Sequence, residues 1–153
     1  MINEIDQKIV EILLRDARIT HAQIAETVGL SRPAVAERIR KLEQAGIIEG
    51  YTAIVSPEAM GRSITAFISA RYMGILDDTV RRGLNDLAKQ EEILEMHSVA
   101  GEDCFLIKVR TIGMQELNQV VNRLKAPPFE MVTKTTIVLE RYFEKVGGVT
   151  LAS

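Results

Sequence analysis

The stretch from residue 20 to residue 42 constrains the fold most, because it encodes two short helices joined by a tight turn. Thr20 and Ser31 are each suited to the start of a helix, since their hydroxyl oxygens can accept a backbone N–H hydrogen bond. Ala25 lies where two helices must approach closely, and Gly29 lies four residues later, where the turn requires a positive φ. Together these residues predict a helix-turn-helix.

A further helix is predicted before this motif and a strand after it. Apolar residues at three to four residue spacing predict a first helix that ends near Asp16, and Asp6 is suited to capping its start. The third helix is predicted over residues 32–45, and Gly46 ends it in the left-handed conformation. The β-branched and aromatic residues of the segment 47–55 then predict one strand.

The rest of the chain alternates strands and helices in the order β-α-β-β-α-β. We expect strands at 64–73, 93–99, 104–110 and 132–141, and helices at 79–89 and 115–124. This order is typical of the ferredoxin-like fold, in which two helices cover one face of an antiparallel sheet. Apolar residues occupy both faces of the strands, which predicts that the open face packs on another subunit.

The predicted fold class is therefore α+β, with two domains. The first is a helix-turn-helix, winged-helix-like domain of residues 1–55. Residues 56–62 carry turn-forming residues and are expected to link it to the second domain, the ferredoxin-like residues 63–153.

The whole chain carries a net charge of −2, so any contact with nucleic acid requires a local basic patch. The predicted third helix supplies one, since residues 32–41 hold four basic residues and one acid, whereas the whole region of residues 1–55 holds seven basic and eight acidic residues. The second helix of a helix-turn-helix enters the major groove of duplex DNA. We expect phosphate contacts from Ser31, Arg38, Arg40 and Lys41, and base-edge contacts from Arg32, Ala34 and Glu37. The alternative that these charges merely solvate an exposed helix stays open.

Other classes of function find little support in the composition. Cys104 is the only cysteine, and the start of the chain does not resemble a secretory signal, so we expect a cytoplasmic protein without disulfides. Charges interrupt every hydrophobic run, which argues against a membrane partner. With two histidines, His21 and His97, we expect no metal site, no cofactor and no catalytic residues.

The combination of the two halves resembles one family. Residues 6–48, notably Leu30-Ser31, Arg38-Ile39 and Gly46-Ile47-Ile48, are similar to the DNA-binding half of the Lrp/AsnC, or feast/famine, regulators. The β-α-β-β-α-β half, notably residues 99–108, is similar to the ligand-sensing and assembly domain of that family. The resemblance implies a sequence-specific DNA-binding transcriptional regulator. It also implies dimers joined through their sheet faces, commonly assembled into octamers, with small effectors, often amino acids, bound between dimers.

One loop departs from the family pattern of glycine, acid, aromatic residue and Asp. Gly101 and Glu102 match it, whereas Asp103 stands where an aromatic residue is usual and Cys104 where the second acid is usual. A neutral thiol is a weaker hydrogen-bond partner for an ammonium group than a carboxylate is. The resemblance implies an effector site at these four residues. It leaves open whether Glu102 or Asp103 takes over the missing role, whether the effector differs, or whether the loop is only a hairpin turn.

Two other functions remain as alternatives to a DNA-binding regulator. One is a small-molecule sensor that does not bind DNA. The other is an enzyme similar to siroheme decarboxylases, which resemble these regulators in fold and use His and Arg in the corresponding domain, so that His97 would be the residue to examine. Because the chain keeps a basic recognition helix, we expect it not to be an enzyme.

Overall fold

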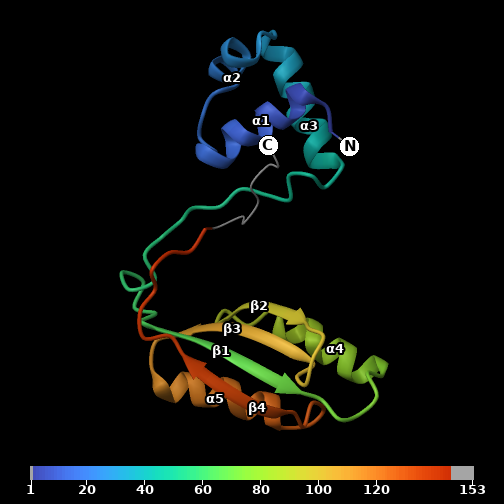
Figure 1. Cartoon of the computed structure of the whole chain (residues 1–153), viewed down its shortest axis with the longest axis vertical. Helices are drawn as coiled ribbons and strands as arrows, with labels where there is room; N and C mark the ends of the chain where they lie inside the picture. Colours follow the sequence, from blue (N-terminus) through green and yellow to red (C-terminus); the bar gives the residue numbers. More distant parts are fainter. Residues whose placement is uncertain (1, 146–153) are drawn as a thin grey trace. The chain divides into compact units, whose positions relative to one another are not determined.

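The computed structural model describes residues 2–145, and the chain divides into two compact units. The first unit runs through Ile54 and the second comprises Val55–Phe143. Figure 1 shows helices alone in the first unit and a sheet with two helices in the second. In chain order the elements are α1 Glu4–Arg15, α2 His21–Val28, α3 Arg32–Gln44, β1 Ile64–Arg71, α4 Asp78–Leu87, β2 Ile93–Ser98, β3 Phe105–Thr111, α5 Met114–Lys125 and β4 Val132–Ile137.

The start of α1 differs from the sequence prediction. Asn3, and not Asp6, is the capping residue, and its side-chain oxygen accepts a hydrogen bond from the backbone N–H of Asp6 at 2.9 Å. Both residue types can cap a helix, but Asn3 comes first in the chain and so takes the position. The carboxylate of Asp6 is therefore available for a contact with another element.

The predicted helix-turn-helix is confirmed. Thr20 and Gln23 form a complete capping box at the start of α2. Gly29 ends that helix with φ of 70°, a conformation in which glycine is favoured, and the hydroxyl of Ser31 caps α3. The three helices enclose one apolar core, formed by Ile9, Ile24, Ala25, Val35, Ile39 and Leu42.

The segment 47–55 is not a strand, so this prediction is wrong. Among the described residues, every strand belongs to the sheet of the second unit. A strand needs a partner to pair its backbone groups, and β-branched residues alone cannot supply one. Ile54 and Val55 consequently stay exposed, at 78% and 60% of their surface.

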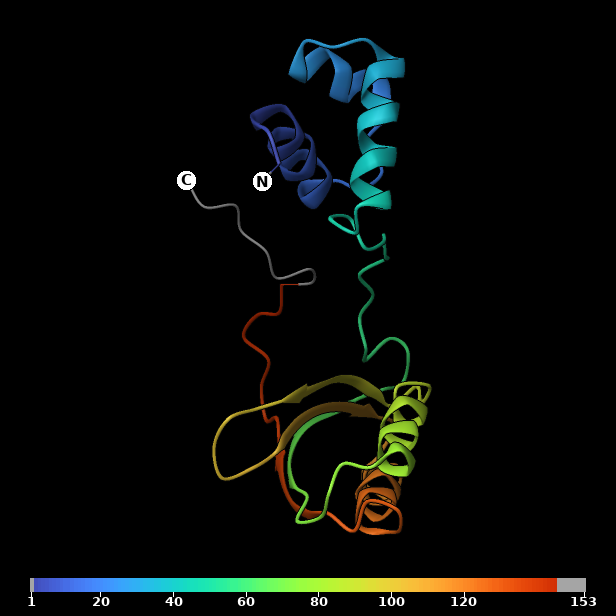
Figure 2. The same ribbon diagram turned by 90° about the vertical axis from the view of Figure 1, so that its right-hand side faces the viewer.

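The second unit has the predicted ferredoxin-like arrangement. Its sheet has the strand order β2-β3-β1-β4 with antiparallel pairing throughout. Figure 2 shows α4 and α5 on the same side of this sheet. Between helices and sheet lies a core that includes the fully buried Ile68, Ile107, Val109, Val120 and Leu124. Strand β4 ends at Ile137, which pairs with Ala66, and not near residue 141, although the N–H of Val138 still donates to Thr65 O at 2.8 Å.

The open face of the sheet is mixed in polarity and not uniformly apolar. Phe67 lies on it, 37% exposed, but its neighbours in register are Lys108 on β3 and Thr136 on β4. Lys108 Nζ in turn donates a hydrogen bond to Glu95 on β2 at 3.1 Å. The alternation of residues along the strands indicates which ones face this side, but only the register shows that Lys108 and Thr136 flank the aromatic ring.

Gly83 in α4 lies against the ring of Phe129, and this contact yields a stability prediction. A Cβ atom added at Gly83 would lie 2.8 Å from Phe129 Cζ, and Phe129 is only 6% exposed. We expect Gly83→Ala to destabilise the protein by about 1 kcal/mol, because overpacking costs about 1–3 kcal/mol and the better helix propensity of alanine recovers about 1 kcal/mol.

Urea unfolding would measure this change. Asn85→Ala, at an exposed position of the same helix, is the matched control and should be neutral or slightly stabilising. A Gly83→Ala protein as stable as the parent would show that the ring of Phe129 moves aside without cost.

Candidate nucleic-acid interface and effector loop

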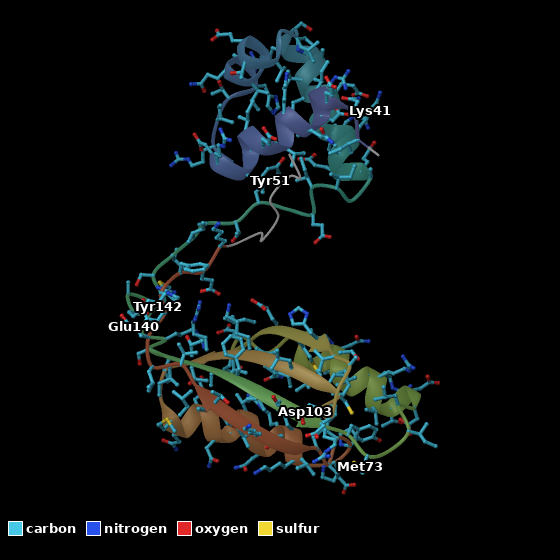
Figure 3. All side chains as sticks on the ribbon, viewed as in Figure 1. Lys41, Tyr51, Met73, Asp103, Glu140 and Tyr142 are labelled. Carbon is cyan, nitrogen blue, oxygen red and sulfur yellow. The ribbon has the colours of Figure 1, made fainter. Side chains whose placement is uncertain are left out.

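Helix α3 presents a charged face to solvent. Val35, Ile39 and Leu42 point into the core, so residues on the opposite side of the helix face outward. These are Glu37, Arg40 and Lys41, whose side chains are 48%, 51% and 68% exposed. Figure 3 shows Lys41 projecting away from the helical core.

The charges on this face neutralise one another in part. Arg40 donates two hydrogen bonds to the carboxylate of Glu37, from Nε at 2.8 Å and from a terminal nitrogen at 2.6 Å. Lys41 Nζ lies 3.7 Å from the same carboxylate. The hydrogen bonds from Arg40 hold the pKa of Glu37 below its usual value, and Glu37 in turn raises the pKa of Arg40. Two cations share one acid, so the face carries one net positive charge.

Arg38 lies on the flank of α3 that faces α1. One of its terminal nitrogens donates to Asp6 Oδ1 at 2.7 Å. The two side chains are 31% and 18% exposed, so water screens this ion pair less than it screens the pair on the outer face. The structure thus separates Arg38 from the other basic residues of α3 and uses its charge to join two helices.

The remaining predicted residues lie at the start of α3. Ser31 Oγ accepts a hydrogen bond from Ala34 N at 3.4 Å, which leaves the hydroxyl proton free to donate. Ala34 is half-buried. Arg32 is exposed, and its guanidinium takes part in no hydrogen bond or ion pair with residues 2–145.

Two hollows border the helices, and both include residues that sequence reasoning missed. One, of about 530 Å³, is lined by Arg32 together with Arg18, Ile19, Thr20, His21 and Ala22. The signal for Arg18 was present in the sequence as a cation two residues before the capping Thr20.

The second hollow, of about 260 Å³, includes Tyr51 and Glu43 in its lining. The hydroxyl of Tyr51 donates to Glu43 at 2.9 Å. Burial, followed by this hydrogen bond, raises the pKa of Tyr51 to about 12. The contact ties the segment after α3 back to that helix.

The loop between β2 and β3 carries the predicted effector residues. Gly101 has φ of 146°, which other residues rarely adopt, and Glu102 is exposed. Cys104 is tied to β1 and the residue after it, because its N–H donates to Ala70 O at 3.0 Å and its thiol to Tyr72 O at 3.5 Å.

The two acids of this loop are available to a ligand. Neither the carboxylate of Glu102 nor that of Asp103 takes part in a hydrogen bond or ion pair within the described chain. Figure 3 shows Asp103 at the end of the sheet where this loop lies. The thiol of Cys104, by contrast, already has a carbonyl partner.

His97 lies on the open face of the sheet in β2. Its Nε2 is 3.4 Å from Glu95 Oε2, and the same carboxylate accepts the hydrogen bond from Lys108. This hydrogen bond from Lys108 is the main reason why the pKa of Glu95 lies below its usual value. Within residues 2–145, no group of three or more His, Cys, Asp or Glu side chains is placed to hold a metal ion. No helix of the described chain is long and apolar enough to cross a membrane.

Comparison with known proteins identifies both units. Residues 2–49 match the winged helix-turn-helix DNA-binding family, and residues 65–147 match the Lrp/AsnC ligand binding domain. The HTH-type transcriptional regulator FL11 of Pyrococcus horikoshii is 36% identical over 143 residues, which cover 94% of this chain and 93% of that protein.

Solved structures agree with this assignment. The crystal structure of the Mycobacterium tuberculosis leucine response regulatory protein LrpA has a TM-score of 0.85 and 30% identity, and the match covers 94% of this chain and 97% of that one. A feast or famine regulatory protein from M. tuberculosis complexed with L-methionine has a TM-score of 0.85 and 29% identity, with 95% and 97% covered. The chain therefore belongs to the Lrp/AsnC family of transcriptional regulators, with a helix-turn-helix DNA-binding unit followed by a ligand-binding unit.

Proposed function

We propose that this regulator binds duplex DNA through the outward face of α3. The observation that carries the proposal is the exposed group of Glu37, Arg40 and Lys41 on the second helix of a helix-turn-helix, opposite its buried stripe. In this motif the second helix enters the major groove, so these side chains would face the bases and the flanking phosphates.

Each predicted residue then has a role. Arg40 and Lys41 contact phosphates, and the hydroxyl of Ser31 donates to another. Arg32, Ala34 and Glu37 lie nearest to base edges, where a glutamate can accept a hydrogen bond from the amino group of cytosine. Arg38 belongs to the set as a positioning residue, because its ion pair with Asp6 holds α3 against α1.

Replacing both outward cations tests this proposal. Arg40→Ala combined with Lys41→Ala should weaken binding to any duplex, and the slope of log affinity against log salt should flatten by about 0.9, since Glu37 offsets one of the two cations and each net phosphate contact contributes about 0.9. Lys125→Ala, in the last turn of α5, is the control and should change nothing. Unchanged affinity and slope in the double variant would contradict the proposed face, and a parent protein that binds no duplex would favour the sensor that does not bind DNA.

We further propose that a small effector, of the amino-acid class, binds at the loop of residues 101–104. The free carboxylates of Glu102 and Asp103 support this, because a carboxylate can accept hydrogen bonds from an ammonium group. The related regulator complexed with L-methionine supports the same class of ligand. Because the thiol of Cys104 is engaged by Tyr72 O, the two acids are the better candidates for the ammonium contact.

A thermal-shift panel of the standard amino acids tests the effector site. A ligand that binds the folded state raises the melting temperature as its concentration exceeds the dissociation constant. Gly101→Val should abolish this rise, because its positive φ suits glycine, while Gly113→Val, at an equally open glycine with extended backbone, should keep it. No shift with any amino acid in the parent would show an effector-independent regulator.

The proposed assembly is a homodimer through the open face of the sheet, extended to larger oligomers such as octamers. Phe67 supports this placement, because it is a large apolar side chain exposed on the face that the helices leave uncovered. The charged neighbours Glu95 and Lys108 already satisfy one another and can enter such an interface as a pair. We propose a cytoplasmic location and no enzymatic activity, in keeping with relatives named as transcriptional regulators.

A further inference from the structure

The cations of the first unit fall into two groups. Arg38, Arg40 and Lys41 are each paired with an acid of the same unit. The side chains of the others, Lys8, Arg15, Arg18 and Arg32, take part in no hydrogen bond or ion pair with the described residues. Cations without an acid partner therefore lie outside the face formed by Glu37, Arg40 and Lys41, and two of them, Arg18 and Arg32, line one hollow.

Arg18 and Arg32 also share one site. They come from different elements, the loop before α2 and the first residue of α3, and both line the hollow of about 530 Å³. Two like charges bordering one hollow repel each other and raise its positive potential, so an anion placed there relieves the repulsion. The guanidinium group also presents several donors in a planar fork, which matches the oxygens of a phosphate.

We propose that Arg18 and Arg32 hold a backbone phosphate of the bound duplex in this hollow. The inference rests on the proposed DNA binding by α3, because the hollow adjoins the start of that helix and would face the backbone beside the occupied groove. It assigns to Arg18 a role in DNA binding that the sequence analysis did not give it, and it places Arg32 on the backbone and not on a base edge.

The hollow and the outward face of α3 would then contribute differently to DNA binding. The hollow supplies two unpaired cations, and hence most of the affinity that does not depend on sequence. The outward face of α3, with one net charge, contributes less to that affinity and more to the reading of bases. Arg18 and Arg32 can therefore contact a phosphate even while Arg40 and Lys41 are paired with Glu37.

Salt titrations of DNA binding by the full chain test this site. The probe is a mixed-sequence duplex, and the variants are Arg18→Gln, Arg32→Gln and their combination. Each single change should reduce the slope of log affinity against log salt by about 0.9, and the double change by about 1.8. Lys8→Gln, which removes the same charge from an exposed position of α1 outside the hollow, should leave the slope unchanged. Thermal unfolding of all variants should match the parent, since neither arginine side chain has a partner to lose.

The outcomes separate this inference from the proposed function. If the parent binds the duplex and both arginine variants behave like Lys8→Gln, the phosphate site is overturned and the role of α3 stands. If only Arg32→Gln lowers the slope, Arg32 acts from α3 alone and the shared site is overturned. If the parent binds no duplex at low salt, both proposals fail together.

Discussion

Arg38→Ala should destabilise the helical unit by about 1–2 kcal/mol while changing the salt dependence of DNA binding little. The reason is that the substitution leaves the carboxylate of Asp6 without its ion-pair partner. Asp6 is only 18% exposed, and its carboxylate would lose the guanidinium that donates to it at 2.7 Å. A half-buried carboxylate without a partner keeps its desolvation cost and loses the compensating hydrogen bond.

Arg40→Ala is the matched comparison, because it removes the same charge from the same helix. Its ion pair with Glu37 is half exposed and joins two residues within one helix turn, so its loss should alter stability by no more than about 0.5 kcal/mol. We expect the reverse order in DNA binding, with a flatter salt slope for Arg40→Ala than for Arg38→Ala.

Unfolding by heat or urea measures the first effect. A loss of 1 kcal/mol lowers the melting temperature by about 4–8 °C in a domain of roughly 60–100 residues. Asp6→Ala and the double variant complete a cycle that isolates the pairwise energy between the two side chains. Equal stability of Arg38→Ala and Arg40→Ala, with the slope reduced by Arg38→Ala, would assign Arg38 to a phosphate after all.

Local signals in the sequence predicted the helical unit well. The capping box of Thr20 and Gln23, the turn at Gly29 and the cap at Ser31 each depend on residues within four positions of one another, and all are present. The cap at Asp6 was wrong because Asn3 competes for the same role. The ion pair that Asp6 forms instead joins residues 32 positions apart, a distance at which the sequence gives no signal.

The segment 47–55 shows the limit of strand propensity. Its composition favours an extended chain, but a strand exists only where a second strand pairs with it. The sheet of the second unit was predictable, since a tight turn brings β2 and β3 together and the order of elements favours a ferredoxin-like sheet. The polarity of its open face depends on register, which places Lys108 beside Phe67.

Glu37, Arg40 and Lys41, which the sequence predicts to contact DNA, are exposed on α3, but the net charge of their face is lower than the sequence analysis implied. The pairs of Glu37 with Arg40 and with Lys41 follow the i, i+3 and i, i+4 spacing of helical neighbours, so this part could have been read from the sequence. The hollow that joins Arg18 to Arg32 could not, because it depends on how two helices and a loop pack.

Glu37→Gln should raise the affinity for a mixed-sequence duplex by about tenfold at low salt, which corresponds to about 1.4 kcal/mol. In the parent, the carboxylate holds Arg40 by two hydrogen bonds and lies 3.7 Å from Lys41 Nζ. A phosphate must compete with this internal acid for both cations. Removing the negative charge frees one net cation for the backbone, so the slope of log affinity against log salt should steepen by about 0.9.

The same change should weaken discrimination between sequences. A carboxylate near a base edge accepts a hydrogen bond from the amino group of cytosine and repels phosphates, so it favours correct placement over loose binding. Glu43→Gln is the matched control, because it removes one negative charge from the same helix but from a residue that pairs with Tyr51 and not with a cation. An equal gain in DNA affinity from both variants would show that Glu37→Gln acts only through the net charge of the helix.

The pH dependence of DNA binding distinguishes a Glu37 carboxylate that is paired with Arg40 from one that is unpaired. Because the hydrogen bonds from Arg40 keep the pKa of Glu37 below its usual value, the carboxylate stays ionised as the pH falls toward the range where free glutamates begin to protonate. The paired acid therefore continues to oppose DNA binding, and the advantage of Glu37→Gln over the parent should persist from about pH 7 down to about pH 4, where a free glutamate is largely protonated. A parent whose affinity rises to that of the variant across this range would show that Glu37 protonates freely, and the ion pair with Arg40 would then not be what restrains the recognition helix.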